Sequence, residues 1–307
     1  MSTAISIIIT IYNRENYLEE CLTSVLNQTF TNFEAIMIDD GSTDTSPDIA
    51  KKFAEKDKRF KYVPTSHIGF SAAKNLGLSK AVGDFIIFLD SDDSAYPYWL
   101  ELLYNAAIKT QSDISTCYYD EYVEGKKPKL PEPPKEAFMK LALPIAEYSY
   151  LKMNLIYHRF CSCYIWNKLI KKNLYNNIQF KDQIALSDFS VIYKIFDKAN
   201  KVVQIQIPLI HYRRHADSIC GKCSKLGLEY FLLRANLLEE STKFVWENYA
   251  QSQAAVQCVL RSELYRMQQE LTKEDFYKYI DRPFFRLVLS SKPIQYFYPE
   301  GMQQYAK

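Results

Sequence analysis

The feature of this sequence that most constrains its fold is an apolar run, Phe85–Leu89, that ends in three aspartates, Asp90, Asp92 and Asp93. Continuous apolar runs of this length are typical of strands buried on both faces, as in a parallel sheet. Carboxylates so close together repel one another, and each raises the pKa of the next. The turn after this strand therefore needs a positive partner, which a side chain, a helix end or a metal ion can supply.

Strand-like and helix-like segments alternate through the first part of the chain. Strands are expected at Ala4–Ile11, Phe33–Asp40, Phe60–Thr65 and Asp84–Asp90. Helices are expected within Tyr12–Gln28, after Ser46 as N-cap with Pro47 at the first helical position, and from about Ser71 to Gly83. This alternation predicts a doubly wound, mostly parallel α/β sheet.

Polar residues gather at the expected carboxyl ends of these strands: Thr10, Tyr12, Asp39, Asp40, Asp90 and Asp92. In a doubly wound sheet this edge is where a ligand binds. A single aspartate there is explained equally well as a helix cap or turn residue. Three such sites converging on one edge favour a binding site.

The pattern changes further along the chain. A helix is expected over Tyr98–Thr110, a strand over Asp113–Val123, an irregular loop over Glu124–Lys135, a helix from Asp188 and a strand over Lys201–Arg213. From Leu226 to Tyr279 the apolar spacing is helical, and the last residues are basic and aromatic. We therefore predict an α/β domain, residues 1–222, and a C-terminal helical region, residues 223–307.

Composition excludes several classes of protein. The net charge of +2 gives no electrostatic case for nucleic acid binding. No apolar run approaches the length of about 20 residues that spans a bilayer, and the N-terminus lacks the basic segment and cleavage site of a signal peptide. The seven cysteines are scattered and indicate no disulfide framework. We expect a cytoplasmic protein that is soluble or attached peripherally to the inner face of the membrane.

The aspartates at the end of the Phe85–Leu89 run suit a cation. Aspartates two residues apart at a strand end can point to the same side, and such oxygen ligands suit Mn²⁺ or Mg²⁺ shared with phosphate. The eight glycines form neither a GxGxxG motif nor a P-loop. A bound phosphate is therefore expected to be neutralised by a metal rather than by a glycine-rich backbone loop.

Three segments carry a family resemblance: SIIITIYNRENYLEECLTSVLNQTFTNFEAIMIDDGSTDTS, IGFSAAKNLGLSKAVGDFIIFLDSDD and WNKLIKK. They resemble family 2 glycosyltransferases with the GT-A fold, a Rossmann-like catalytic domain. The match covers about the first 110 residues and continues more weakly to about Ile219. It implies transfer of a sugar, with inversion, from a nucleoside diphosphate sugar.

The resemblance also implies a donor site. Thr10, Tyr12 and Asp40 match positions that hold the base and ribose, Asn75 and Lys74 match positions near the sugar and diphosphate, and Asp92 matches the metal ligand. Lys74 stands where relatives more often have arginine. The positive charge is kept, but a lysine cannot make the two parallel hydrogen bonds of a guanidinium. The nucleotide-sugar-binding set implied is Thr10, Tyr12, Arg14, Asp39, Asp40, Lys74, Asn75, Asp90, Ser91, Arg213, Arg214 and His215.

The same resemblance indicates Asp188 as the catalytic base. An inverting transfer needs a carboxylate to take the proton of the attacking hydroxyl. Relatives usually carry a Glu-Asp pair at the start of a helix, and here Ser187 replaces the glutamate. Asp182 is a weaker candidate for the base, and Asp188 could alternatively be only an acid favoured by the helix dipole.

Two motifs have competing readings. His211, His215, Cys220 and Cys223 could form a Cys₂His₂ zinc site, although their order is reversed from that of the common zinc finger. Trp166 and Asn167 resemble an acceptor-side segment, where a tryptophan can stack on a sugar, but a core role explains Trp166 equally well.

The leading interpretation is a metal-dependent glycosyltransferase that uses a UDP-hexose or UDP-N-acetylhexosamine. Its acceptor would be a glycan or lipid-linked glycan of a bacterial capsule, O-antigen, lipooligosaccharide or teichoic acid. The C-terminal helices could form a homo-oligomer contact or a membrane-surface contact. The alternatives are a nucleotidyltransferase, for which the N-terminal glycine-rich loop is missing, and an inactive GT-A subunit of a glycan-assembly complex, which Ser187 keeps open.

Overall fold

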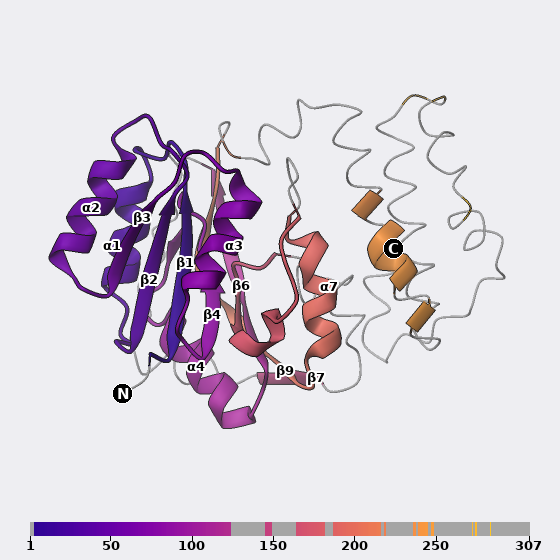
Figure 1. The fold of residues 1–307 in the computed structure, drawn as a ribbon. Coiled ribbons are helices and arrows are strands. Elements are labelled where there is room, and N and C mark those ends of the chain that lie inside the picture. The colour runs from indigo at the N-terminus through magenta and orange to yellow at the C-terminus, as the bar shows by residue number, and fades with distance from the viewer. Residues whose placement is uncertain are drawn as a thin grey trace. The chain divides into compact units, whose positions relative to one another are not determined.

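The computed structural model describes residues 3–123, 145–148, 164–181, 187–215 and 218, and a few residues further on (236–237, 239–244, 247–248, 272, 274 and 283). The chain forms two compact units: residues 1–152 with 163–222, and residues 153–162 with 223–307. In the second unit the described residues 239–244 are helical. Figure 1 shows the first unit as a sheet with helices packed around it.

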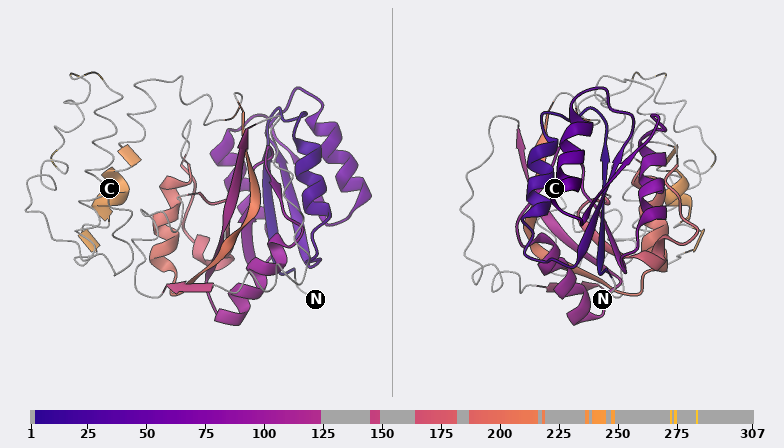
Figure 2. Two further views of the ribbon diagram at one scale, coloured as in Figure 1. Left: turned by 180° about the vertical axis from the view of Figure 1, so that it is seen from behind. Right: turned by 60° about the vertical axis from the view of Figure 1, so that its left-hand side comes forward.

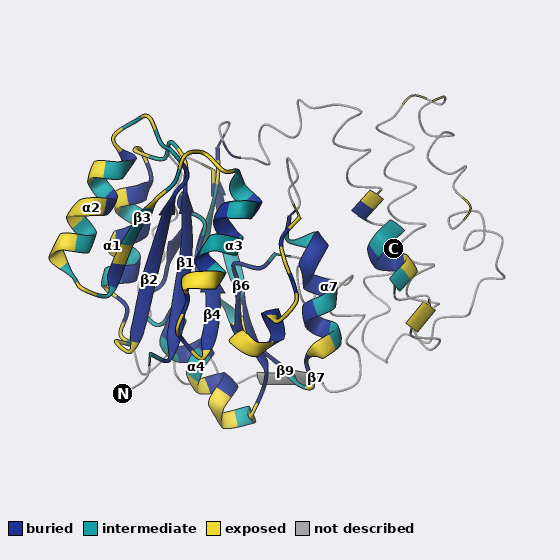
Figure 3. Cartoon of the chain, in the orientation of Figure 1, coloured by how far each residue is buried: buried dark blue, intermediate teal, exposed yellow. Residues whose placement is uncertain are grey.

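Four parallel strands form one half of the sheet, in the order β3-β2-β1-β4. They are β1 (Ile5–Ile11), β2 (Phe33–Asp39), β3 (Phe60–Pro64) and β4 (Phe85–Phe88). Every residue of β1, β2 and β4 is buried (Figure 3), which accounts for their unbroken apolar runs. This half confirms the doubly wound sheet predicted from the sequence.

The other half of the sheet is mixed. It contains β5 (Ser94–Ala95), β6 (Ile114–Val123), β7 (Ile145–Tyr148), β8 (Lys168–Lys171) and β9 (Val202–Arg214). β8 runs antiparallel to both β4 and β6, whereas β9 runs parallel to β6. The sequence did not reveal β5, β7 and β8, because strands of two to four residues are too short to show a period.

The helices of the first unit cover both faces of the sheet. They are α1 (Leu18–Leu26), α2 (Ser46–Lys56), α3 (Phe70–Lys80), α4 (Trp99–Thr110) and α7 (Phe189–Lys198), with a 3₁₀ turn, η1, at Lys172–Tyr175. Crossovers between parallel strands are right-handed. The chain moves one way along the sheet through β1, β2 and β3 and then returns to β4, so α1 and α2 lie on one face and α3 on the other (Figure 2).

One helix start differs from the prediction. α1 begins at Leu18, within the predicted Tyr12–Gln28, after a turn in which the backbone N–H groups of Tyr17 and Leu18 both donate to the Arg14 carbonyl. Thr45, not Ser46, precedes α2, and the Ser46 hydroxyl instead accepts a hydrogen bond from the Arg14 N–H at 2.8 Å. Both contacts fix the backbone of Arg14 in the loop after β1.

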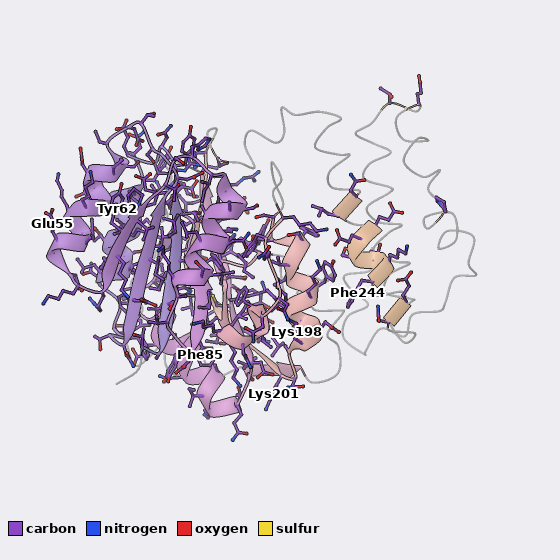
Figure 4. All side chains as sticks on the ribbon, viewed as in Figure 1. Glu55, Tyr62, Phe85, Lys198, Lys201 and Phe244 are labelled. Atoms are coloured by element: carbon purple, nitrogen blue, oxygen red, sulfur yellow. The ribbon has the colours of Figure 1, made fainter. Side chains whose placement is uncertain are left out.

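No helix among the residues described is long and apolar enough to cross a bilayer. Figure 4 draws the described side chains on the ribbon, with Tyr62 of β3 and Phe85 of β4 labelled.

Replacing Gly77 by alanine is expected to destabilise the first unit by about 1–3 kcal/mol through overpacking. Gly77 lies in α3, where an added Cβ would stand 2.4 Å from Cγ2 of the fully buried Ile8. The better helix propensity of alanine, about 1 kcal/mol, offsets only part of this clash. Urea unfolding of the variant against Ser79→Ala, at an exposed position of the same helix, would measure the effect. Equal midpoints for the two variants would contradict it.

Candidate functional site

A cavity of about 230 Å³ opens at the carboxyl ends of the parallel strands. It lies where β1 has β2 on one side and β4 on the other, the switch point at which α/β sheets bind ligands. Its lining residues come from the ends of β1, β2, β4 and β9 and from the start of α3: Thr10, Ile11, Tyr12, Arg14, Asp40, His67, Phe70, Ala73, Asp90, Ser91, Asp92, Tyr212, Arg213 and Ser218.

One wall of the cavity is aromatic. The rings of Tyr12 and His67 stack with centroids 4.3 Å apart and planes 25° apart. Tyr12 remains 43% exposed, so the ring is available to a flat ligand. His67 has φ of 56°, a conformation uncommon for a residue with a side chain, and its Nδ1 lies 3.0 Å from the Asp40 carbonyl.

The Asp40 carboxylate organises the loop that leads into α3. It accepts hydrogen bonds from the Thr65 hydroxyl at 2.9 Å and from the backbone N–H groups of Ile68 at 2.6 Å and Gly69 at 3.0 Å. Asp40 thus lines the cavity while holding the loop that carries His67.

Asp39 does not line the cavity. Its carboxylate accepts hydrogen bonds from the Ser42 N–H at 3.1 Å and from the Tyr62 hydroxyl at 2.6 Å. Burial, followed by the hydrogen bond to Asp39, raises the pKa of Tyr62 well above its usual value. Asp39 therefore fixes the turn after β2 from behind, and Gly41, with φ of 74°, makes that turn possible.

The Asp92 carboxylate lines the cavity and contacts two other side chains. Its Oδ2 lies 3.4 Å from Arg14 Nε and 3.0 Å from His215 Nε2. Burial alone would raise the pKa of Asp92, but the hydrogen bond from His215 and the charge of Arg14 lower it. Arg14 is a positive partner of the kind that the sequence led us to expect, and His215 adds a hydrogen bond to the same oxygen.

The neighbouring acids are less well neutralised. Asp90 lines the cavity, and its backbone carbonyl accepts the Cys21 thiol at 3.6 Å, but its carboxylate has no hydrogen bond or ion pair with any other described side chain. Burial raises the pKa of Asp90 to about 7. The charge of Lys74 opposes this shift, whereas those of Asp92 and Asp188 add to it. Burial also raises the pKa of Asp93, whose Oδ1 accepts the Arg213 N–H at 2.8 Å.

Arg213 ties the end of β9 to the acidic turn. Its Nε donates to the Asp92 carbonyl at 2.9 Å, and its guanidinium pairs with Glu20 at 2.5 Å. The guanidinium lies 5.0 Å from the Tyr17 ring centroid and 5.2 Å from that of Tyr122. It therefore fixes one wall of the cavity and also faces the ligand space.

Arg214 is not among the lining residues of the cavity. Its guanidinium pairs with Glu121 at 2.8 Å and its side chain is 66% exposed. The structure therefore does not bring Arg214 to the cavity with Arg213, because successive side chains of a strand point to opposite faces. His215 is buried and contacts Asp92, but it is not among the lining residues either.

Lys74 and Asp188 form an ion pair of 2.7 Å beside the cavity, in which the Asp188 side chain is 14% exposed. Asn75 uses its amide to donate to the Phe180 carbonyl and to accept from the Phe180 N–H, each at 2.9 Å. None of these three predicted residues is among the lining residues of the cavity. Asn75 acts in the described structure as a clamp between α3 and the segment before α7.

Trp166 and Asn167, which resemble an acceptor-side segment, are both buried. Trp166 is only 3% exposed, and its ring stacks on those of Tyr164 and Tyr212, with centroids 5.0 and 5.5 Å away. Asn167 is buried and donates to the Cys117 carbonyl at 2.8 Å. Both therefore serve the core here, and Tyr212 is the member of this aromatic group that reaches the cavity.

The zinc reading receives no support from the residues described, because His215 bonds to Asp92 and the His211 ring packs on Tyr96 with centroids 4.1 Å apart. Among these residues no group of three or more His, Cys, Asp and Glu side chains is placed to hold a metal ion. Asp182, Cys220 and Cys223 lie outside the described residues.

Six lining residues are outside the set expected from the sequence: His67, Phe70, Ala73, Tyr212, Ile11 and Ser218. The first three could have been expected from the sequence, because residues 67–73 lead into α3, the helix that returns the chain to β4. The start of that helix lies at the switch point, where α/β sheets bind ligands. Tyr212 could have been found only from the pairing of β9 with β6, which the sequence does not reveal.

The comparisons of this chain with known proteins agree on one family. Residues 6–196 match the family described as Glycosyl transferase family 2. The glycosyltransferase GlyG of Streptococcus pneumoniae serotype 4 is 34% identical over 230 residues, covering 71% of this chain and 73% of GlyG. The cholesterol galactosyltransferase of Borreliella burgdorferi is 34% identical over 209 residues, covering 64% of this chain and 56% of that protein.

A solved structure shares the fold. The crystal structure of S. aureus TarS 1–349 in complex with UDP-GlcNAc gives a TM-score of 0.68 at 20% identity, covering 91% of this chain and 79% of the TarS chain. At that identity the likeness shows the α/β fold alone.

Proposed function

Because this chain belongs to glycosyltransferase family 2, we propose that it transfers a sugar, with inversion, from a UDP-sugar to a hydroxyl of a bacterial surface glycan. The observation that carries this proposal is the cavity at the switch point. It has the exposed Tyr12 ring on one wall and the Asp90–Asp92 turn with Arg14 and Arg213 on another. A flat base and a charged diphosphate need these two kinds of surface.

The donor is proposed from the relatives. TarS has been solved with UDP-GlcNAc, and one relative is named a galactosyltransferase. These names support a uridine nucleotide carrying a hexose or an N-acetylhexosamine. The lining residues support a nucleotide through Tyr12, whose ring suits base stacking.

We propose Mn²⁺ or Mg²⁺ as the cofactor, held by Asp92. His215 Nε2 lies 3.0 Å from Asp92 Oδ2 and would orient that carboxylate. Carboxylate oxygens suit these ions, and the diphosphate would complete the set of ligands. When bound, such an ion stabilises the negative charge of the departing diphosphate.

The protein's own part in the reaction would be to position the groups and to accept a proton. The acceptor oxygen forms a bond to the anomeric carbon, the bond from that carbon to the diphosphate oxygen breaks, and the acceptor proton passes to the Asp188 carboxylate. UDP leaves with the bonding electrons. Arg14 and Arg213, which line the cavity beside Asp92, would hold the diphosphate through charge-assisted hydrogen bonds.

The acceptor, the location and the assembly belong to the same proposal. A cytoplasmic enzyme at the inner face of the membrane would meet a lipid-linked glycan there, and residues 223–307 would supply the membrane-surface or homo-oligomer contact. The basic and aromatic composition of residues 282–299 supports a membrane-surface contact.

Calorimetry with UDP, GDP, CDP and dTDP, each with Mn²⁺ and with EDTA, tests the donor class. We expect UDP alone to bind, and only with metal. Release of UDP from UDP-glucose, UDP-galactose, UDP-GlcNAc and UDP-GalNAc then tests turnover, with water in place of the acceptor. Binding of UDP without turnover of any of these sugars would favour the inactive-subunit alternative.

Replacing Tyr12 by alanine is expected to weaken UDP binding by about 1–3 kcal/mol, the usual value of base–aromatic stacking. The cause is the loss of the ring that stacks on His67 while remaining 43% exposed. Tyr12→Phe keeps the ring and should bind UDP as the wild type does. Wild-type affinity in the alanine variant, measured by calorimetry, would show that the base binds elsewhere.

A further inference from the structure

Lys74 is an unusually buried cation that contacts an acid far along the chain. It lies in α3 with a side chain 3% exposed, and its Nζ donates to Asp188 Oδ1 at 2.7 Å. The other carboxylate oxygen of Asp188 accepts the Ile165 N–H at 2.9 Å. Both oxygens of Asp188 are therefore held, one by a charge and one by the backbone.

Three phenylalanine rings surround the ammonium group. Their centroids lie 4.3, 5.1 and 5.6 Å from Nζ, in Phe70, Phe180 and Phe88 respectively. Cation–π contacts of this kind are stronger when the cation is desolvated. Asp188 is the one described carboxylate that forms an ion pair with this ammonium.

The placement of the pair relates it to the cavity. Phe70 and Ala73, on the same helix as Lys74, line the cavity, whereas Lys74 does not. The ammonium therefore lies just behind the wall, out of contact with the space where a diphosphate would bind. Asp188 is close enough to Asp90, at the cavity, for its charge to raise the pKa of Asp90.

We infer that Lys74 is a positioning residue for Asp188 and not a donor-binding residue. This inference rests on the proposed function, in which Asp188 takes the proton of the acceptor hydroxyl. A carboxylate that must meet a hydroxyl at hydrogen-bond distance loses rate when its orientation is not fixed. Lys74, itself fixed by three rings, supplies that orientation across 114 positions of sequence.

The test compares Lys74→Met and Lys74→Arg with the wild type in the full-length protein. Release of UDP from the best UDP-sugar gives kcat, and calorimetry with UDP and Mn²⁺ gives Kd. We expect Lys74→Met to lower kcat about 100-fold, the cost of about 1 Å of misplacement, with an unchanged Kd. Lys74→Arg should restore most of the rate, because a guanidinium can also donate to Asp188.

Lys171→Met is the matched control. Lys171 also pairs with an acid, Asp113, at 2.8 Å, but neither residue lines the cavity. This variant should keep both kcat and Kd. Lys74→Gln, whose neutral amide can still donate to Asp188 in the same cage, should keep more of the rate than Lys74→Met.

The outcomes separate the inference from the proposed function. A wild-type kcat in Lys74→Met would overturn the inference alone, as would a large rise in Kd for UDP with kcat preserved. Failure of the wild type to release UDP from any of the UDP-sugars would overturn the proposed function, and the inference with it.

Discussion

Asp188→Asn is expected to lower kcat by about 10²- to 10⁴-fold, the usual contribution of a general base. The amide has nearly the shape of the carboxylate but cannot accept a proton at neutral pH. UDP binding should persist, because Asp188 does not line the cavity. Rates of UDP release and calorimetry with UDP measure the two effects separately.

The control addresses the simpler role of an acid at a helix start. Asp48 lies in the first turn of α2, where an acid favours the helix dipole, and its side chain is 72% exposed. Asp48→Asn should leave kcat unchanged. If Asp188→Asn behaved in the same way, Asp188 would be a helix-terminus acid and no more. Circular dichroism would check folding, since the Asp188 variant leaves the buried Lys74 without a counter-ion.

Asp92→Ala is expected to abolish metal-dependent binding of UDP. The substitution removes the carboxylate that both Arg14 and His215 contact, and with it the proposed metal ligand. Titration of UDP in Mn²⁺ and in EDTA should then give the same weak or undetectable heat, whereas the wild type should differ between the two conditions.

Asp93→Asn is the matched control for this experiment. Asp93 is the next residue, but it does not line the cavity, and the amide oxygen can still accept the Arg213 N–H that Asp93 accepts now. Metal dependence should therefore survive. Metal-dependent UDP binding in Asp92→Ala would contradict the assignment of Asp92 and place the ion elsewhere.

The parallel half of the sheet could be predicted from the sequence because its strands are unbroken apolar runs separated by amphipathic helices. Asp90 and Asp92 could be placed for the same reason, since the carboxyl ends of such strands share one edge. In the mixed half, β6 and β9 could be predicted as strands, but the order and pairing of the strands could not. β8 and β5 are too short to show a period, and β9 reaches the site only through its pairing with β6 and β5.

The roles of individual acids were harder to predict than their location. Asp39 and Asp40 are adjacent at the end of β2, yet one faces Tyr62 behind the site and the other lines the cavity. The partner of Asp188 was also invisible, because Lys74 is separated from it by 114 positions. Sequence shows which residues share an edge, but side-chain direction and long-range pairing depend on packing.

The position of β1 in the sheet has a consequence for how the chain is made. β1 is synthesised before both of its neighbours, yet it is central, with Ile5 opposite Phe33 on one side and Phe85 on the other. Until Phe85–Phe88 leaves the ribosome, a fully buried strand of the mature fold has one unpaired edge of backbone N–H and C=O groups. Such an edge is a template for pairing with other chains. Translation that stops before β4 should therefore yield insoluble fragments, and protection of the nascent N-terminal strand is needed until the later strand arrives.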